Sequence, residues 1–383
     1  MTFPYTLLQS SYWMSFCVCI CFATIYLQGI GFSNTKLGIV CALGNLAGVF
    51  LGPYLAGLMD KDERCAPVKI MPYILILQAL CCIILRFVMN SEILSSVFYI
   101  LYMMLCVAFD TPLLKVYSDL SYAEKKVDYS LARGMGSLSF MAISALLGLL
   151  IEKTSVKAVL YSGILMTLYQ YLAYLYIKGR MPEIKIRKET DQSSTLAAFI
   201  RSQPAFVVML CGTALLFFAH NNITGFLINV VKNVGGDTAV AGFLNSFMAL
   251  IEIPVMLFYT KWFGKKDQKK VLAASFIAFS VKELSFALSR NLGGLYFSYL
   301  FQAPSFALYS ASIVPYVEEK IEYKDRAKAQ SLAYTLTTIG SVLSSVFAGT
   351  LYDHTSVNNT LWISFFVSLL GTIVCLYAMK KEK

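Results

Sequence analysis

Leu147-Gly148-Leu149-Leu150-Ile151-Glu152-Lys153-Thr154-Ser155 has a counterpart later in the chain, Ala348-Gly349-Thr350-Leu351-Tyr352-Asp353-His354-Thr355-Ser356. Each segment closes a long apolar run with Gly, an acidic residue and Thr-Ser at the same spacing, and Ser144 and Ser345 are also in register. A match of this kind indicates an internal repeat, with chance similarity between two helices rich in small residues as the alternative. A repeat would divide the chain into two halves of one design.

Apolar runs fill the rest of the chain. Of 383 residues, 57% are hydrophobic and 14% charged, against roughly 45–50% and about 25% in soluble proteins. Because a membrane crossing takes about 20 apolar residues, this composition leaves no room for a separate soluble domain and predicts an all-α integral membrane protein. The runs predict twelve transmembrane helices, at residues 10–32, 35–59, 68–89, 93–116, 129–151, 158–178, 203–228, 237–259, 270–289, 292–317, 328–352 and 361–379.

The longest polar stretch follows the sixth run. We therefore expect a six-helix bundle at 1–178, a cytoplasmic linker at 179–202 and a second six-helix bundle at 203–383. Six helices, an even number, separate the two copies of the repeated segment, so both copies cross the membrane in the same direction. The prediction is two parallel six-helix repeats.

The positive charges predict the orientation. The chain has 32 Lys and Arg against 22 Asp and Glu. If both termini are cytoplasmic, 24 of the 32 fall in inner segments, five in outer segments and three inside the runs. Such an asymmetry reports topology rather than nucleic-acid binding. We expect a monomeric, multi-pass protein of the plasma membrane with both termini in the cytoplasm, and a first run that is a mature helix rather than a cleaved signal peptide.

Motifs for metals and cofactors are sparse. The sequence has no CxxC pair, two His and no GxxxxGK[ST] phosphate loop. We therefore expect no disulfide framework, no metal site, no cofactor and no ATP-driven motor within this chain. Energy for any transport would come from a gradient or from another protein.

One loop resembles a family motif. Gly57-Leu58-Met59-Asp60-Lys61-Asp62-Glu63-Arg64, between the second and third runs, is similar to the loop motif of the major facilitator superfamily, except that Glu63 replaces the second Gly of that motif. The resemblance implies the fold of that superfamily and a role in gating for Asp60 and Arg64. The alternative is a solvated turn.

A second resemblance covers more of the chain. Tyr129-Ser130-Leu131-Ala132-Arg133-Gly134-Met135-Gly136-Ser137 is similar to the start of helix five in the oligosaccharide:proton and nucleoside symporter branch, as are Phe301–Phe306, Asp325–Ser331 and Ser280-Val281-Lys282 to later parts of it. The resemblance implies that Arg133 grips substrate hydroxyls, and its rigid fork of N–H donors suits that contact. The alternative for Arg133 is a positive anchor at the inner membrane surface.

Several functional positions depart from that branch. Aligned without gaps from Arg133, the sugar-gripping Glu of the branch falls on Lys115, its proton-carrying Glu on Gln302 and the His partner of that Glu on Tyr299. Any proton route has therefore moved to other residues.

Charged residues inside the runs are the candidates for coupling, because a charge at membrane depth needs a partner, water or a function. Glu252 and Lys282 lie at similar depth, which predicts a pair between them; the alternative is a static strut. Glu283, beside Lys282, could replace Glu252 as the partner and ranks below it. Asp110, two residues before Pro112, is predicted to face inward as a proton carrier or substrate ligand, or else to pair with a basic group as plain structure.

Polar groups in the second half complete the predicted substrate site. His220 and Asn221 in the seventh run can bind hydroxyls or purine edges, although a lone His in an apolar helix is often a packing residue. Gln302 and Asn245 add neutral amides at membrane depth.

Two stripes of small residues predict a gate. Gly44, Gly48 and Gly52 recur every four residues in the second run, and Ser341, Ser345 and Gly349 do so in the eleventh. Small stripes let helices approach closely. We expect the two stripes to meet across the halves; the alternative is that each packs within its own half.

These features predict a secondary transporter that moves a small polar solute with protons by alternating access. The solute classes expected from the resemblance are sugars, oligosaccharides and nucleosides. Efflux of amphipathic compounds on the same fold is the first alternative, and a membrane-embedded enzyme or sensor is the second.

Overall fold

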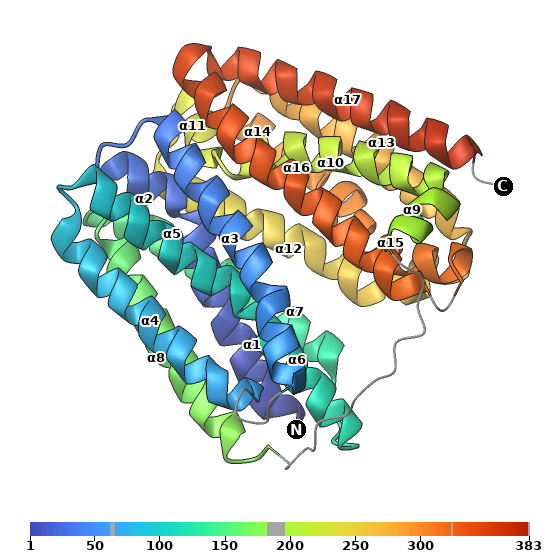
Figure 1. Ribbon diagram of the computed structural model, residues 1–383. Coiled ribbons are helices and arrows are strands. Elements are labelled where there is room, and N and C mark those ends of the chain that lie inside the picture. Colours follow the sequence, from blue (N-terminus) through green and yellow to red (C-terminus); the bar gives the residue numbers. More distant parts are fainter. Residues whose placement is uncertain (62–65, 182–195, 323–324, 382–383) are drawn as a thin grey trace. The chain divides into compact units, whose positions relative to one another are not determined.

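The computed structural model describes residues 1–61, 66–181, 196–322 and 325–381 (Figure 1). Every regular element among these residues is a helix. Ten helices are long and apolar enough to cross a membrane. A pair bent by 43°, residues 2–21 with 23–29, gives an eleventh candidate if it is counted as one span. The expected all-α membrane fold is confirmed, with ten or eleven candidate spans where twelve were predicted.

The tenth predicted helix is the one that the structure interrupts. The run at 292–317 consists of α14 (Leu292–Leu300), a five-residue π-helix η3 (Ala303–Ala307) and α15 (Leu308–Lys320). Pro304 has no N–H to donate, and the Ala307 N–H instead reaches back five residues to the Gln302 carbonyl at 3.2 Å. The first predicted helix also changes: α1 (Thr2–Phe16) begins at Thr2, because Pro4 lies in the first turn, where N–H groups have no partner in the helix.

The described residues form two compact units. The first comprises Met1–Glu189 with Asp237–Ala249, and the second Thr190–Gly236 with Leu250–Lys383. The division between them falls inside α12 (Thr238–Phe263), so one long helix belongs partly to each. The predicted six-helix bundles at 1–178 and 203–383 stay a prediction.

In the first unit, α1 packs against α7 and α8, α3 against α5, and α4 against α5 and α8. The repeated segment explains one contact: a Cβ atom on Gly148 would lie 2.9 Å from Gly242 Cα, so α7 and the first half of α12 touch through their backbones. Ser246 Oγ donates to the Met141 carbonyl at 2.7 Å across the same contact. Besides α1, the elements of this unit are η1 (Cys17–Cys21), α2 (Ala23–Gly29), α3 (Asn34–Lys61), α4 (Pro67–Val88), α5 (Glu92–Ala108), α6 (Asp110–Tyr122), α7 (Tyr129–Lys153) and α8 (Ala158–Lys178).

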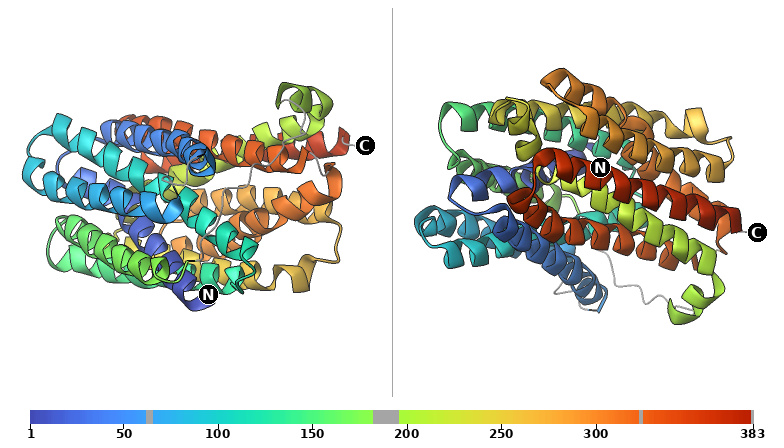
Figure 2. Two further views of the ribbon diagram at one scale, coloured as in Figure 1. Left: turned by 60° about the horizontal axis from the view of Figure 1, so that its bottom comes forward. Right: turned by 90° about the horizontal axis from the view of Figure 1, so that it is seen from above.

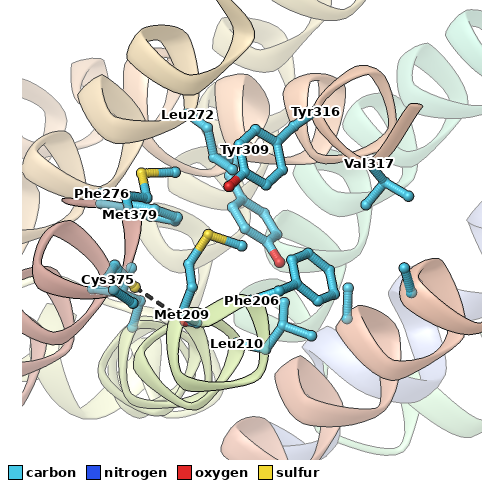
Figure 3. Packing of buried hydrophobic residues seen from close by; sticks show 14 of the residues in the cluster. Phe206, Met209, Leu210, Leu272, Phe276, Tyr309, Tyr316, Val317, Cys375 and Met379 are labelled. Carbon is cyan, nitrogen blue, oxygen red and sulfur yellow. Dashed lines mark hydrogen bonds between the residues drawn. The ribbon is translucent and has the colours of Figure 1, made fainter. Parts of the chain in front are cut away.

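In the second unit, α17 packs against both α10 and α13, and α10 also packs against α16 (Figure 2). The core between these helices is aromatic and sulfur-rich: Tyr309 lies among Phe206, Leu272 and Phe276, and Cys375 Sγ donates to the Met209 carbonyl at 3.3 Å (Figure 3). The remaining elements are α9 (Leu196–Ser202), α10 (Pro204–Thr224), α11 (Leu227–Asn233), α13 (Gln268–Leu288), α16 (Arg326–His354) and α17 (Val357–Lys381).

Candidate functional site

The second unit encloses a cluster of ionisable and amide side chains around Lys282 on α13. Its Nζ lies 2.6 Å from His220 Nδ1, donates to Gln302 Oε1 at 3.3 Å and pairs with Glu283 Oε1 at 3.4 Å. Gln302 Nε2 in turn donates to Glu252 Oε1 at 2.8 Å. We call these five residues the Lys282 cluster; they link α10, α12, α13 and the break after α14.

The break after α14 puts Gln302 in this cluster. The chain leaves the α-helical pattern at Phe301, and the π-turn that follows rotates the next residues relative to α14. The Gln302 amide can then accept from Lys282 and donate to Glu252 at once, which uses both ends of the group. Gln302 therefore links Glu252 to Lys282 without direct contact between the two charged groups.

Aromatic side chains surround the cluster. The His220 ring stacks on Phe306 with centroids 5.1 Å apart, and Phe217 packs against both His220 and Phe279. Lys282 Nζ lies 5.0 Å from the Phe279 ring centroid. In an apolar surrounding of this kind, charges interact strongly and an uncompensated charge is costly.

The direct partner of Lys282 is Glu283 and not Glu252, which had been ranked first. Its side chain is fully buried and forms the direct ion pair with Lys282, whereas Glu252 is joined to Lys282 through Gln302. Adjacent residues point about 100° apart around a helix, but α13 is covered on several sides, by α10, α15 and α17, so both faces are interior. Neither Glu283 oxygen receives a hydrogen bond from a described residue.

The other predicted polar groups of the second half separate into different roles. His220 belongs to the Lys282 cluster. Asn221 instead joins two helices: its Nδ2 donates to the Ser341 carbonyl at 3.0 Å and to Ser345 Oγ at 3.3 Å. Asn245 is buried in the half of α12 that belongs to the first unit, so it is not part of the cluster.

A second polar group lies in the first unit, around Arg133 at the start of α7. Its guanidinium carbon sits 3.9 Å from the centroid of the Trp13 ring, and Nη1 donates to Ser137 Oγ at 2.8 Å. Gly136 makes room for the indole, since a Cβ there would lie 2.6 Å from Trp13 Cδ1. Trp13 is a member that the sequence did not indicate, because no spacing connects residue 13 with residue 133.

Asp110 begins α6, directly after the one-residue break at Phe109. The charge of Arg133 acts on Asp110, and Asp110 in turn acts electrostatically on Tyr5 and Tyr129. Among the residues that the structure describes, the Asp110 carboxylate makes no hydrogen bond or ion pair. Arg133 is the basic group whose charge acts on Asp110, and a structural pairing between the two stays an alternative prediction.

The contacts of the small-residue stripes lie within each unit. A Cβ on Gly44, Gly48 or Gly52 would meet Met103, Val107 or Thr111 of α5 and α6. These contacts, like those of Ser341 and Ser345 with Asn221, correspond to packing within one half. A contact between the two stripes, including Gly349, stays a prediction. Arg64 and the side chain of Asp60 lie outside the described residues.

A family model matches residues 5–363, nearly the whole chain, and its description is the MFS_1 like family. The chain belongs to the MFS_1 like family. As a member, it is a multi-pass membrane transporter of the major facilitator type and not an enzyme, so a small-molecule substrate and a lipid bilayer are its partners.

Individual relatives of this MFS_1 like protein are distant. It is 23% identical over 366 residues, 94% of this chain and 93% of the relative, to the "Probable 3-phenylpropionic acid transporter" of Escherichia coli (strain K12). It is 19% identical over 177 residues, 46% of this chain and 44% of the relative, to "Multidrug resistance protein 2" of Bacillus subtilis (strain 168). A crystal structure of a mutant of the nucleoside transporter NupG shares its fold, with a TM-score of 0.81, 15% identity and 98% of each chain covered.

Proposed function

We propose that the chain is a proton-coupled secondary transporter of a small organic solute and that the Lys282 cluster couples the proton to the solute. The observation that carries the proposal is the buried ion pair of Lys282 with Glu283, set in a line of polar groups that ends at Glu252. Titratable groups at membrane depth are costly and are retained where they serve transport. Both termini in the cytoplasm and a plasma-membrane location are part of the proposal.

The incomplete hydrogen bonding of Glu283 favours a role in proton coupling over that of a static structural pair. A structural buried pair needs good geometry and partners for its remaining atoms. Among the described residues, the Glu283 carboxylate has one cation, Lys282 Nζ at 3.4 Å, and accepts no hydrogen bond. Lys282, by contrast, has three polar neighbours, so it keeps partners when Glu283 takes up a proton and becomes neutral. A proton can then bind to Glu283 and leave it while the Lys282 ammonium keeps its other polar partners.

The groups around Arg133 in the first unit and around Lys282 in the second each support a substrate class. Sugars, oligosaccharides and nucleosides are favoured by the arginine fork stacked on Trp13, which offers donors to hydroxyl groups beside an aromatic face. An aromatic carboxylate is the second class. Its carboxylate could take the place of Glu283 at Lys282 once Glu283 is protonated, and Phe279 and Phe306 could contact its ring. The name of the Escherichia coli relative supports the same class.

Efflux of an amphipathic compound remains the alternative direction. The aromatic surroundings of the cluster suit such a compound, and the partial match to a multidrug resistance protein supports it. Two acids and a lysine in one cluster favour coupling to a proton in either direction.

The test uses purified protein in liposomes with an imposed proton gradient. Radiolabelled lactose, uridine and 3-phenylpropionate are the probes, each measured with and without a protonophore and with the gradient in both directions. We expect at least one probe to accumulate and the protonophore to abolish its accumulation. Glu283→Gln should lose accumulation but retain exchange, because an amide cannot carry a proton; Glu92→Gln, an exposed acid, is the control. Accumulation by Glu283→Gln at the wild-type level would overturn the proposal.

A further inference from the structure

The turn between α12 and α13 carries a concentrated positive charge. Five lysines and a single acid, Asp267, lie between residues 261 and 270. Exposed aromatic residues precede them on the last turns of α12. We call this surface the basic turn; it consists of Phe258, Lys261, Trp262, Lys265, Lys266, Lys269 and Lys270.

The backbone of the basic turn is held in place by buried hydrogen bonds. Gln268 is buried at the start of α13; its Oε1 accepts from the Tyr259 hydroxyl at 2.5 Å. Its Nε2 donates to the carbonyls of Phe263 and Lys266 at 3.1 and 2.9 Å. The Asp267 carboxylate caps the helix by accepting from the Lys269 N–H at 2.9 Å. The turn therefore presents its lysines from a fixed support.

Two of these lysines carry charge that no described acid neutralises. Lys261 and Lys265 are exposed and form no ion pair with a described residue. The Lys270 side chain is 86% exposed and only 3.9 Å from Asp267, which is at the limit of an ion pair. Lys320 and Lys328 differ, since Glu319 and Asp325 hold them at 3.2 and 3.1 Å. Lys261 and Lys265 thus carry positive charge that no described acid pairs with, in contrast to Lys320 and Lys328.

The apolar neighbours of these lysines indicate the depth of the surface. Leu257, Phe258, Lys261 and Trp262 lie on one exposed face of α12, at helical spacing, and the Phe258 and Trp262 rings are 5.3 Å apart. Along this face, the aliphatic Leu257 and the aromatic Phe258 come first, and the basic Lys261 and the aromatic Trp262 follow one turn later. That order matches a bilayer from its hydrocarbon edge to its headgroups, where Trp is enriched.

We propose that the basic turn binds the phosphate of an anionic phospholipid. Charge complementarity selects the anionic headgroup, and the aromatic and aliphatic face of α12 selects a lipid rather than a soluble phosphate or a nucleic acid. Lys261 and Lys265 contact the phosphate while Trp262 lies at the level of the glycerol backbone. This binding is independent of the Lys282 cluster and of the transported solute.

The test measures energy transfer from Trp262 to labelled lipid. Trp13→Phe and Trp362→Phe leave Trp262 as the single donor, and the protein is placed in nanodiscs of phosphatidylcholine containing either dansyl-phosphatidylglycerol or dansyl-phosphatidylcholine in equal amount. We expect the phosphatidylglycerol probe to be enriched near Trp262 by about fivefold or more, because each lysine at a membrane surface contributes about a factor of five. Raising NaCl from 0.05 to 0.5 M should remove most of this preference.

The matched variants separate a built site from total charge. Lys261→Gln with Lys265→Gln should abolish the preference, whereas Lys320→Gln with Lys328→Gln, which removes the same charge, should leave it within about twofold of the starting protein. Equal transfer from both lipids, or equal loss in both double variants, would overturn the proposal. Loss of the preference on adding inorganic phosphate at constant ionic strength would mean that the turn binds a soluble anion, which also overturns it.

Discussion

Replacing Lys282 by Met should destabilise the protein severely, and removing the Glu283 charge as well should restore stability. The pair is 1% and 0% exposed, with 3.4 Å between Nζ and Oε1. Breaking a buried pair on one side leaves a carboxylate without compensation, which costs about 3–5 kcal/mol. For a unit of this size that corresponds to a fall in the unfolding temperature of roughly 6–20 °C. The double variant Lys282→Met with Glu283→Gln should lie within a few degrees of wild type, since both charges of the buried pair are gone and Glu252 keeps its hydrogen bond from Gln302.

The assay is thermal unfolding of detergent-solubilised protein for wild type, both single variants and the double variant. Lys36 and Glu92 provide a matched control: their pair is shorter, at 2.6 Å, but the side chains are 56% and 50% exposed. Lys36→Met should change stability by less than about 1 kcal/mol, because water screens an exposed pair. The reasoning is refuted if Lys282→Met is as stable as wild type, or if the double variant is no more stable than the worse single variant.

Three further predictions address other parts of the molecule. Arg133→Lys should raise the half-saturation constant for the transported probe about tenfold or more, because an ammonium cannot stack on Trp13 and donate as a planar fork; an unchanged constant in uptake assays would identify Arg133 as an anchor. Gly48→Ala should lower thermal stability by about 1–3 kcal/mol, since its Cβ would lie 2.6 Å from Val107 Cβ. Gly57→Ala is the control and should be neutral or stabilising, because no atom lies within 4 Å of the added Cβ. Equal effects of the two substitutions would contradict the packing described. Gln302→Leu should reduce gradient-driven accumulation at least tenfold while exchange persists, because it severs the link from Glu252 to Lys282, and wild-type accumulation would remove Gln302 from the coupling route.

The membrane-spanning helices were the feature that the sequence predicted best. Apolar runs of about 20 residues must be helices, because no other open structure satisfies its backbone in lipid, and the predicted runs match the long helices closely. Two runs were exceptions: the first, which begins at Thr2 and is bent, and the run containing Pro304. Hydropathy shows only that a segment stays in the membrane, and it does not report that a missing N–H shifts the chain into a π-turn.

Contacts within the site were less accessible to sequence reasoning. Comparing depths along two helices brought Glu252 level with Lys282, but depth says nothing of rotation, so neither the Glu283 pair nor the intervening Gln302 could be preferred. Small stripes pose the same difficulty, because Gly48 can accept any close neighbour, and in the structure that neighbour is Val107 of the same unit.

Trp13 illustrates a further limit. Its contact with Arg133 joins residues 120 positions apart, which only the packing of α1 against α7 brings together. A sequence pattern with local spacing cannot encode such a pair. The resemblance pointed to Arg133, and only the structure added the aromatic face beneath it.

The most direct test of the central claim is to count protons moved with the solute. Wild-type and Glu283→Gln proteins are reconstituted in liposomes that contain pyranine, and lactose, uridine and 3-phenylpropionate are added in turn with no imposed gradient. The account predicts that the transported probe acidifies the lumen in wild type, and that Glu283→Gln exchanges the same probe with no change in luminal pH. Transport by wild type without proton movement, or acidification by Glu283→Gln equal to that of wild type, would contradict coupling through the Lys282 cluster.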